Sequence, residues 1–278
     1  MTAVATPDSV ASVPTTAHVS FIHTLRSEWI KFLSVRSTAW VLAISILIMV
    51  GFSLMMAAGM TFATDPEMTG GEPLPADPSV GIMVATFGYS IGQIVLVVLG
   101  VMRISGEYAT GQIRSSLAAV PRRLPVLAAK AVVVALASFV VGLVAVALAT
   151  LVTTPILEPH GMAVDLSDGD AQRALLGVPL YLMAIALFSL GIGAMLRHTA
   201  GGIAAVIGVL MVLPIIGQIN LDILQDIAPY LPSAAGERLI TGDLAETVLT
   251  PWQGYLVLLA WVAAALIGAA VLLRRRDA

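Results

Sequence analysis

Six long apolar runs without a single charged residue constrain this chain more than any other feature. They cover residues 39–62, 82–102, 131–154, 174–196, 199–219 and 252–273. An α-helix rises about 1.5 Å per residue, so about 20 apolar residues cross the roughly 30 Å hydrocarbon core of a bilayer. We therefore predict six transmembrane helices, with only a tight turn at Arg197 and His198 between the fourth and the fifth.

The composition excludes an ordinary soluble protein. Hydrophobic residues make up 58% of the chain and charged residues only 11%, whereas soluble domains carry about 25% charged residues. The fold class that we predict is an all-α integral membrane protein. The chain has no cysteine, which excludes a disulfide scaffold, thiolate metal sites and a cysteine nucleophile.

The charges alternate in sign between successive loops. Twelve of the 14 Lys and Arg residues lie before the first run, between the second and third, between the fourth and fifth, or after the sixth. The other loops hold 13 of the 17 acids. Because Lys and Arg concentrate on the cytoplasmic side of membranes, we predict that both termini are cytosolic, which fits an even number of crossings.

Two segments precede the first run. Residues 1–17 lack hydrophobic periodicity and predict a disordered tail. Residues 18–37 place Phe21, Leu25, Trp29 and Phe32 on one helical face, which predicts an amphipathic helix lying in the membrane interface. It either anchors the protein or also contacts a cytosolic partner. The remaining residues, 38–278, form the predicted six-helix domain.

The spans lack the groups that most membrane enzymes and carriers need. None holds an Asp, Glu, Lys, Arg or His in its interior, so the spans offer no proton relay. The chain contains neither HExxH nor GxSxG, and its four histidines are scattered. We expect no catalytic residue, no metal site, no bound cofactor and no nucleic-acid partner.

A few mild polar and small residues interrupt the spans. The small residues allow close helix packing and the polar side chains can hydrogen-bond between helices. These residues are also candidates for a translocation path or a dimer interface. These candidates are Thr86, Gly88, Tyr89, Gly92 and Gln93 in the second span and Pro214 in the fifth. Gly88 and Gly92 form a GxxxG pair, and Pro214 is expected to bend or break its helix.

The segment after the second span is the most specific part of the sequence. It holds Glu107, Tyr108, Gly111, Ile113 and Arg114, and apolar residues recur toward Pro121 as on a short helix. Glu107 is the only acid there, and by proximity it could pair with Arg103 or Arg114. The alternative is an ordinary basic loop on the cytosolic side.

The run Gly-Glu-Tyr-x-x-Gly-x-Ile-Arg, residues 106–114, resembles the membrane-spanning permease subunits of bacterial type-2 ATP-binding-cassette (ABC) exporters. Residues 25–32, 121–130 and 231–236 also resemble segments of that family, in the same order. Ala109 and Gln112 depart from residues that are common there. The resemblance covers nearly everything after residue 20.

The resemblance implies a homodimeric permease that works with two copies of a separate ATPase in the bacterial cytoplasmic membrane. Glu107, Tyr108, Gly111, Ile113 and Arg114 would form the coupling helix that docks on the ATPase. ATP and Mg would bind that partner, since this chain has no GxxxxGK[ST] motif. The expected function is efflux of an amphipathic or hydrophobic substrate, such as a drug, an antibiotic-like metabolite or a lipid. The alternative function is a membrane anchor or assembly scaffold without transport.

Overall fold

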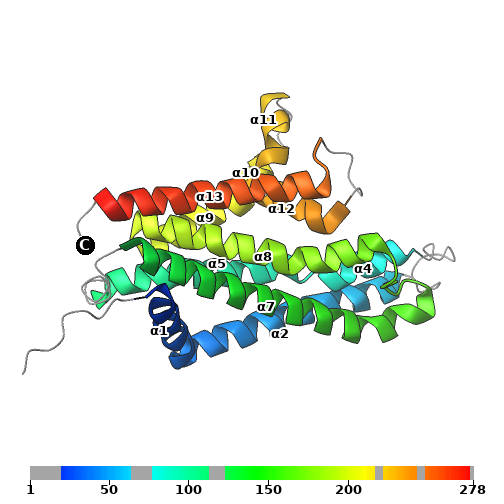
Figure 1. Cartoon of the computed structure of the whole chain (residues 1–278). Coiled ribbons are helices and arrows are strands. Elements are labelled where there is room, and N and C mark those ends of the chain that lie inside the picture. Colours follow the sequence, from blue (N-terminus) through cyan, green and yellow to red (C-terminus); the bar gives the residue numbers. More distant parts are fainter. Residues whose placement is uncertain (1–19, 64–76, 113–122, 217–221, 243–247, 276–278) are drawn as a thin grey trace, which may run out of the picture.

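The computed structural model describes residues 20–63, 77–112, 123–216, 222–242 and 248–275 (Figure 1). Every regular element within these ranges is a helix. The predicted tail at residues 1–17 lies outside the described residues, as do Ile113, Arg114 and the short helix expected before Pro121.

Six helices are long and apolar enough to cross a membrane. This confirms the prediction of an all-helical, multi-pass membrane protein, with bounds that differ from the predicted ones by up to eight residues, at the start of the third span. The helices are α2 (Arg36–Ala63), α4 with α5 (Pro78–Thr86 and Tyr89–Ala109), α7 (Arg123–Leu157), α8 (Gly169–Leu196), α9 with α10 (Thr199–Ile207 and Leu213–Ile216) and α13 (Pro251–Arg275).

Helix α8 forms the centre of the bundle, in contact with α5, α7 and α13 (Figure 1). Tyr181, Leu182 and Ile185 on it are fully buried. The predicted tight turn follows α8 directly. Arg197 adopts a left-handed conformation with φ of 55° and ends the helix, and the ring of His198 accepts the Gly201 N–H and begins α9.

Helix α1 (Phe21–Ser34) lies across one end of the bundle, at the end where the described chain also finishes (Figure 1). Its buried centre line is Thr24, Glu28 and Phe32, spaced by four residues. The predicted apolar face is therefore only partly the buried one: Phe32 is buried, while Phe21 is exposed. The reason is that a charged side chain, Glu28, takes the central position and has partners inside the bundle.

The second span is interrupted between α4 and α5, where Ser53 of α2 forms hydrogen bonds with two backbone groups. The Ser53 hydroxyl donates to the Ala85 carbonyl, and the Gly88 N–H donates to Ser53 Oγ, both at 3.3 Å. Gly88 and Gly92 both lie against Met49 of α2. The GxxxG pair thus serves close packing within one chain.

The fifth span is also irregular, as Pro214 predicts. A π-helical turn, η2 (Gly208–Val212), separates α9 from α10. Proline has no N–H to offer to the carbonyl four residues earlier, which here is Leu210. The Ser233 hydroxyl donates to that carbonyl at 2.7 Å, so a later segment of the chain replaces the missing donor.

Short helices fill the connections on the side of the bundle away from α1. They are η1 (Glu158–His160) after α7, and α11 (Asp222–Ile227), η3 (Ala228–Tyr230) and α12 (Pro232–Thr241) before α13. Helix α12 packs against α8 and α13, whereas α11 projects away from the bundle (Figure 1).

Replacing Gly88 with Ala tests the close approach of α2 and α5. A Cβ at this position would overlap the Met49 backbone, which has no room to move, whereas a Cβ at Gly92 would meet only the flexible Met49 side chain. Because overpacking costs about 1–3 kcal/mol, we expect Gly88→Ala to lower the thermal unfolding midpoint in detergent clearly more than Gly92→Ala does.

Gly51→Ala is the control, because nothing lies within 4 Å of a Cβ there. It should leave the midpoint unchanged or raise it, since alanine favours helices over glycine. A Gly88→Ala protein as stable as Gly51→Ala would contradict the packing described.

Candidate functional site

A lysine inside the bundle binds two glutamates from two other helices. Lys130 of α7 places its Nζ 2.6 Å from Glu28 Oε2 and 2.5 Å from Glu107 Oε1. Glu28 lies on α1 and Glu107 lies in the last turn of α5. We call Glu28, Glu107, Lys130 and the neighbouring Lys31 the ion cluster. It joins three helices that are far apart in the sequence.

Three of the four members of the ion cluster are almost completely shielded from solvent. Glu28 and Lys130 are each 2% exposed and Glu107 is 8% exposed. Burying a charge is expensive unless it is paired and hydrogen-bonded. Glu107 Oε2 is nevertheless buried and has no hydrogen-bond partner among the described residues. A buried and incompletely satisfied group of this kind marks a candidate functional position.

Lys31 completes the charge balance from the rim of the cluster. Its Nζ lies 2.8 Å from Glu28 Oε1 and 3.8 Å from Glu107 Oε1. Burial raises the pKa of Glu28, but the ammonium groups of Lys130 and Lys31 outweigh it and hold that pKa below its ordinary value. Glu28 is therefore ionised at neutral pH.

Arg103 lies one turn before Glu107 and does not bind it directly in the described structure. Its guanidinium instead lies over the Phe32 ring, 4.9 Å from the ring centre, as cations do on aromatic faces. The sequence offered Arg103 or Arg114 as the partner of Glu107. The partner found is Lys130, 23 residues away on the next long helix.

The other predicted coupling residues have different surroundings. Tyr108 is partly buried and lies under the guanidinium of Arg197, 4.8 Å from the ring centre. Gly111 is exposed, with φ of 71°, a left-handed conformation typical of glycine just after a helix. Ile113 and Arg114 lie outside the described residues. That these five residues contact an ATPase stays a prediction.

A second polar group lies between α5 and α8, closer to the start of α5. Tyr181 of α8 donates a hydrogen bond to Gln93 Oε1 at 2.7 Å, and the Gln93 amide donates to the Ser90 carbonyl at 3.0 Å. The Tyr89 ring meets the Tyr181 ring edge to face, with centres 5.4 Å apart. Thr86 donates to the Ile82 carbonyl within its own helix.

These side chains face α8 rather than an open surface. Thr86 and Gln93 are each 5% exposed and Tyr89 is 9% exposed. Pro214 lies on the fifth span, next to the π-helical turn. In this arrangement of the chain, the second-span candidates for a translocation path are covered, and their role in a path or in a dimer interface stays a prediction.

Glu237 joins this polar group, and the sequence argument did not single it out. Its Oε1 lies 3.5 Å from the Tyr181 hydroxyl, because α12 folds back against α8. Burial raises the pKa of Glu237 to about 7 even though the Tyr181 hydrogen bond lowers it. The residue stands in a connection between spans, so a search for ionisable groups inside the spans passes over it.

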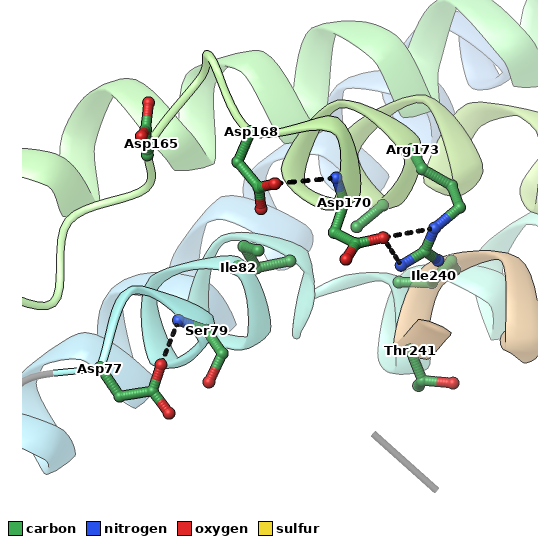
Figure 2. Close-up of a pocket in the computed structure, with 10 residues that line it drawn as sticks. Asp77, Ser79, Ile82, Asp165, Asp168, Asp170, Arg173, Ile240 and Thr241 are labelled. Carbon is green, nitrogen blue, oxygen red and sulfur yellow. Dashed lines mark hydrogen bonds and ion pairs between the residues drawn. The ribbon is translucent and has the colours of Figure 1, made fainter. Parts of the chain in front are cut away.

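An acidic pocket of about 720 Å³ opens beside the first turns of α4 and α8 (Figure 2). Its carboxylates already have structural roles. Asp77 accepts the Ser79 N–H and caps α4, Asp168 caps α8, and Asp170 pairs with Arg173 at 2.9 Å. Asp165 accepts the Ser167 N–H at 2.8 Å, so each of the four carboxylates has a partner within the chain. No group of three or more metal-binding side chains occurs in the described part of the chain.

Comparisons with known proteins give no assignment. The chain matches no model of a known protein family, and a search of curated proteins also finds no match.

Replacing Lys130 with Met tests the ion cluster. The change leaves Glu28 and Glu107 buried together without their shared cation, and removing one partner of a buried pair typically costs about 3–5 kcal/mol. We expect a large drop in the thermal unfolding midpoint at pH 7.5 and a smaller drop at pH 4.5, where the carboxylates can protonate.

The triple variant Lys130→Met, Glu28→Gln, Glu107→Gln serves as the matched control. It removes the uncompensated charges and should recover most of the lost stability. A Lys130→Met protein as stable as the wild type at pH 7.5 would show that the cluster does not hold the helices together.

Proposed function

We propose that the chain is the permease subunit of a bacterial type-2 ABC exporter and forms the membrane path for a separate ATPase. The proposal rests on the motif at residues 106–114, on the six membrane-spanning helices and on the ion cluster. Both termini would be cytosolic, in line with the distribution of Lys and Arg.

The ion cluster is the observation that supports this proposal best. Glu107 lies four residues before Gly111, at the point where α5 ends and the coupling segment begins. A push on that segment reaches Glu107 first and passes through Lys130 to α7, and through Glu28 to α1. Such a rigid connection suits a protein whose spans are moved by a partner that changes shape.

This arrangement also refines the expected role of Glu107. A carboxylate that is 8% exposed and bound to Lys130 cannot offer an open charge to another protein. We therefore assign Glu107 to transmission within the chain, and leave direct contact with the ATPase to Arg114 and the exposed Gly111. Transmission is a positioning role rather than a docking role.

A homodimer is part of the proposal. The fifth span is the least covered of the six candidate spans, and α11 projects from the same side of the bundle (Figure 1). On α11, Ile223 and Ile227 are exposed beside the charged Asp226. A helix that carries aspartates beside exposed isoleucines is a poor neighbour for lipid tails, which favours a second copy of the chain on this side. The cargo expected for the path between them is amphipathic or hydrophobic.

A pair of substitutions tests the two roles with the separate ABC ATPase that the proposal requires. Arg114→Ala should weaken co-purification of the ATPase about tenfold, because it removes a charge-assisted contact. Glu107→Gln should leave co-purification close to normal but lower the stimulation of ATP hydrolysis by the permease. The readouts are the amount of bound ATPase and its turnover in the purified complex.

Glu158→Gln is the control, since Glu158 is an exposed carboxylate at the other end of α7. It should change neither readout. A non-transporting anchor would bind the ATPase without altering its turnover in any variant, and that result, or an absence of binding by the wild type, would refute the proposal.

A further inference from the structure

Helix α12 is fastened to the spans by two polar contacts of different kinds. At its start, the Ser233 hydroxyl donates to the Leu210 carbonyl of the fifth span at 2.7 Å. One turn further on, Glu237 reaches the Tyr181 hydroxyl of α8. Only the second contact involves a group that gains or loses a proton near neutral pH.

Hydrogen-bond accounting favours a proton on Glu237. The Tyr181 hydroxyl has one hydrogen, and it is directed to Gln93 Oε1 at 2.7 Å. The bond from the Gln93 amide to the Ser90 carbonyl fixes which end of the amide is the acceptor. At 3.5 Å, the remaining contact between Tyr181 and Glu237 is too long for a strong O–H···O bond. A protonated Glu237 could donate to Tyr181 Oη and complete the chain of hydrogen bonds.

An ionised Glu237 has no hydrogen to donate to Tyr181. The single Tyr181 hydrogen would have to serve either Gln93 or Glu237, and the other acceptor would lose its donor. If that hydrogen turned to Glu237, water could not readily replace it at Gln93, which is 5% exposed beside the fully buried Tyr181. If it stayed on Gln93, the ionised Glu237 would have no bond to Tyr181 and would no longer hold α12 to α8. A buried polar atom left without a partner costs about 1–3 kcal/mol.

The titratable and charged groups around Glu237 do not supply a cation. Tyr89 of α5 and Tyr181 of α8 face it, and Tyr255 of α13 donates to the Leu180 carbonyl. On α8, Arg173 is bound to Asp170 and to the Leu239 carbonyl. Tyr230 is the titratable residue of η3, and η2 has none.

Within α12 itself, the next residue is Arg238, whose Nε donates to the Leu249 carbonyl at 3.4 Å. No ion pair to Glu237 occurs among the described residues. Burial without a counterion favours the neutral carboxyl group, in agreement with the raised pKa of about 7.

We infer that Glu237 is a proton-binding site whose protonated carboxyl group donates to Tyr181 and fastens α12 to α8 and α5. Loss of the proton loosens this contact, while the contact between Ser233 and Leu210 stays. Glu237 is partly exposed, so a proton can reach it from solvent. The inference does not depend on the proposed transport function.

The first test is the pH dependence of stability of the full chain in detergent. The folded pKa of about 7 lies above the ordinary value of 4.5, so between these pH values the unfolded chain releases a proton that the folded chain keeps. Stability from this group is therefore complete below about pH 4.5 and is lost as the pH rises through about 7. Between pH 5 and pH 8, the thermal midpoint of the wild type should fall by roughly 5 °C more than the midpoint of Glu237→Gln does.

Two further variants separate this effect from general loosening of α12. Ser233→Ala removes the other polar contact and should lower the midpoint by the same amount at every pH. Glu158→Gln removes an exposed carboxylate and should follow the wild type. An equal pH dependence in the wild type and Glu237→Gln would overturn the inference.

The second test measures the position of α12 directly. The chain has no cysteine, and Ile240 near the end of α12 is 3% exposed, so Ile240→Cys provides a single buried thiol. The rate of maleimide labelling is measured at each pH in Ile240→Cys and in the double variant Ile240→Cys, Glu237→Gln. Ionisation of the thiol affects both rates equally, so it cancels when the first rate is divided by the second. The ratio should be close to one at pH 5.5 and rise severalfold above pH 7.5. A ratio that stays constant across this range would contradict the inference.

Discussion

Burial of the Lys130 ammonium group is the constraint on which this account of the molecule depends. An ammonium group that is 2% exposed needs anionic partners, and here they come from α1 and from the end of α5. The need to satisfy one charge therefore determines how the first helix lies across the bundle and where the second span ends. It also explains why Glu28, and not an apolar side chain, occupies the centre of the buried face of α1.

Helix α8 connects this end of the bundle to the other. Near its end, Gly193 allows close contact with Val101 of α5, a turn and a half before Glu107. About 18 Å earlier along the helix, at a rise of about 1.5 Å per residue, Tyr181 meets Gln93 and Glu237. Span α5 thus carries Glu107 of the ion cluster at one end and Gln93 toward the other, and α8 packs against α5 near both and contacts Glu237 of α12. A displacement of α5 by a cytosolic partner would change the surroundings of both polar sites.

Much of the fold could be predicted from the sequence, because the bilayer imposes a length and a composition on each span. The six spans and the break near Pro214 follow from local rules of this kind. The ion cluster could not be predicted, because the partners of Lys130 lie 23 and 102 residues away and no local pattern links them. Glu237 was missed for a similar reason, since only the return of α12 against α8 brings this loop carboxylate to a buried tyrosine.

The measurement that tests the account most directly is uptake of a fluorescent amphipathic dye by sealed vesicles that contain this chain, with and without a separate ABC ATPase subunit. The account predicts accumulation of dye only when both proteins and ATP are present. The proton site at Glu237 would then tune α12 without driving transport. Accumulation against a gradient by vesicles that contain this chain alone, powered by a pH difference across the membrane, would contradict the account and identify the protein as a proton-coupled carrier.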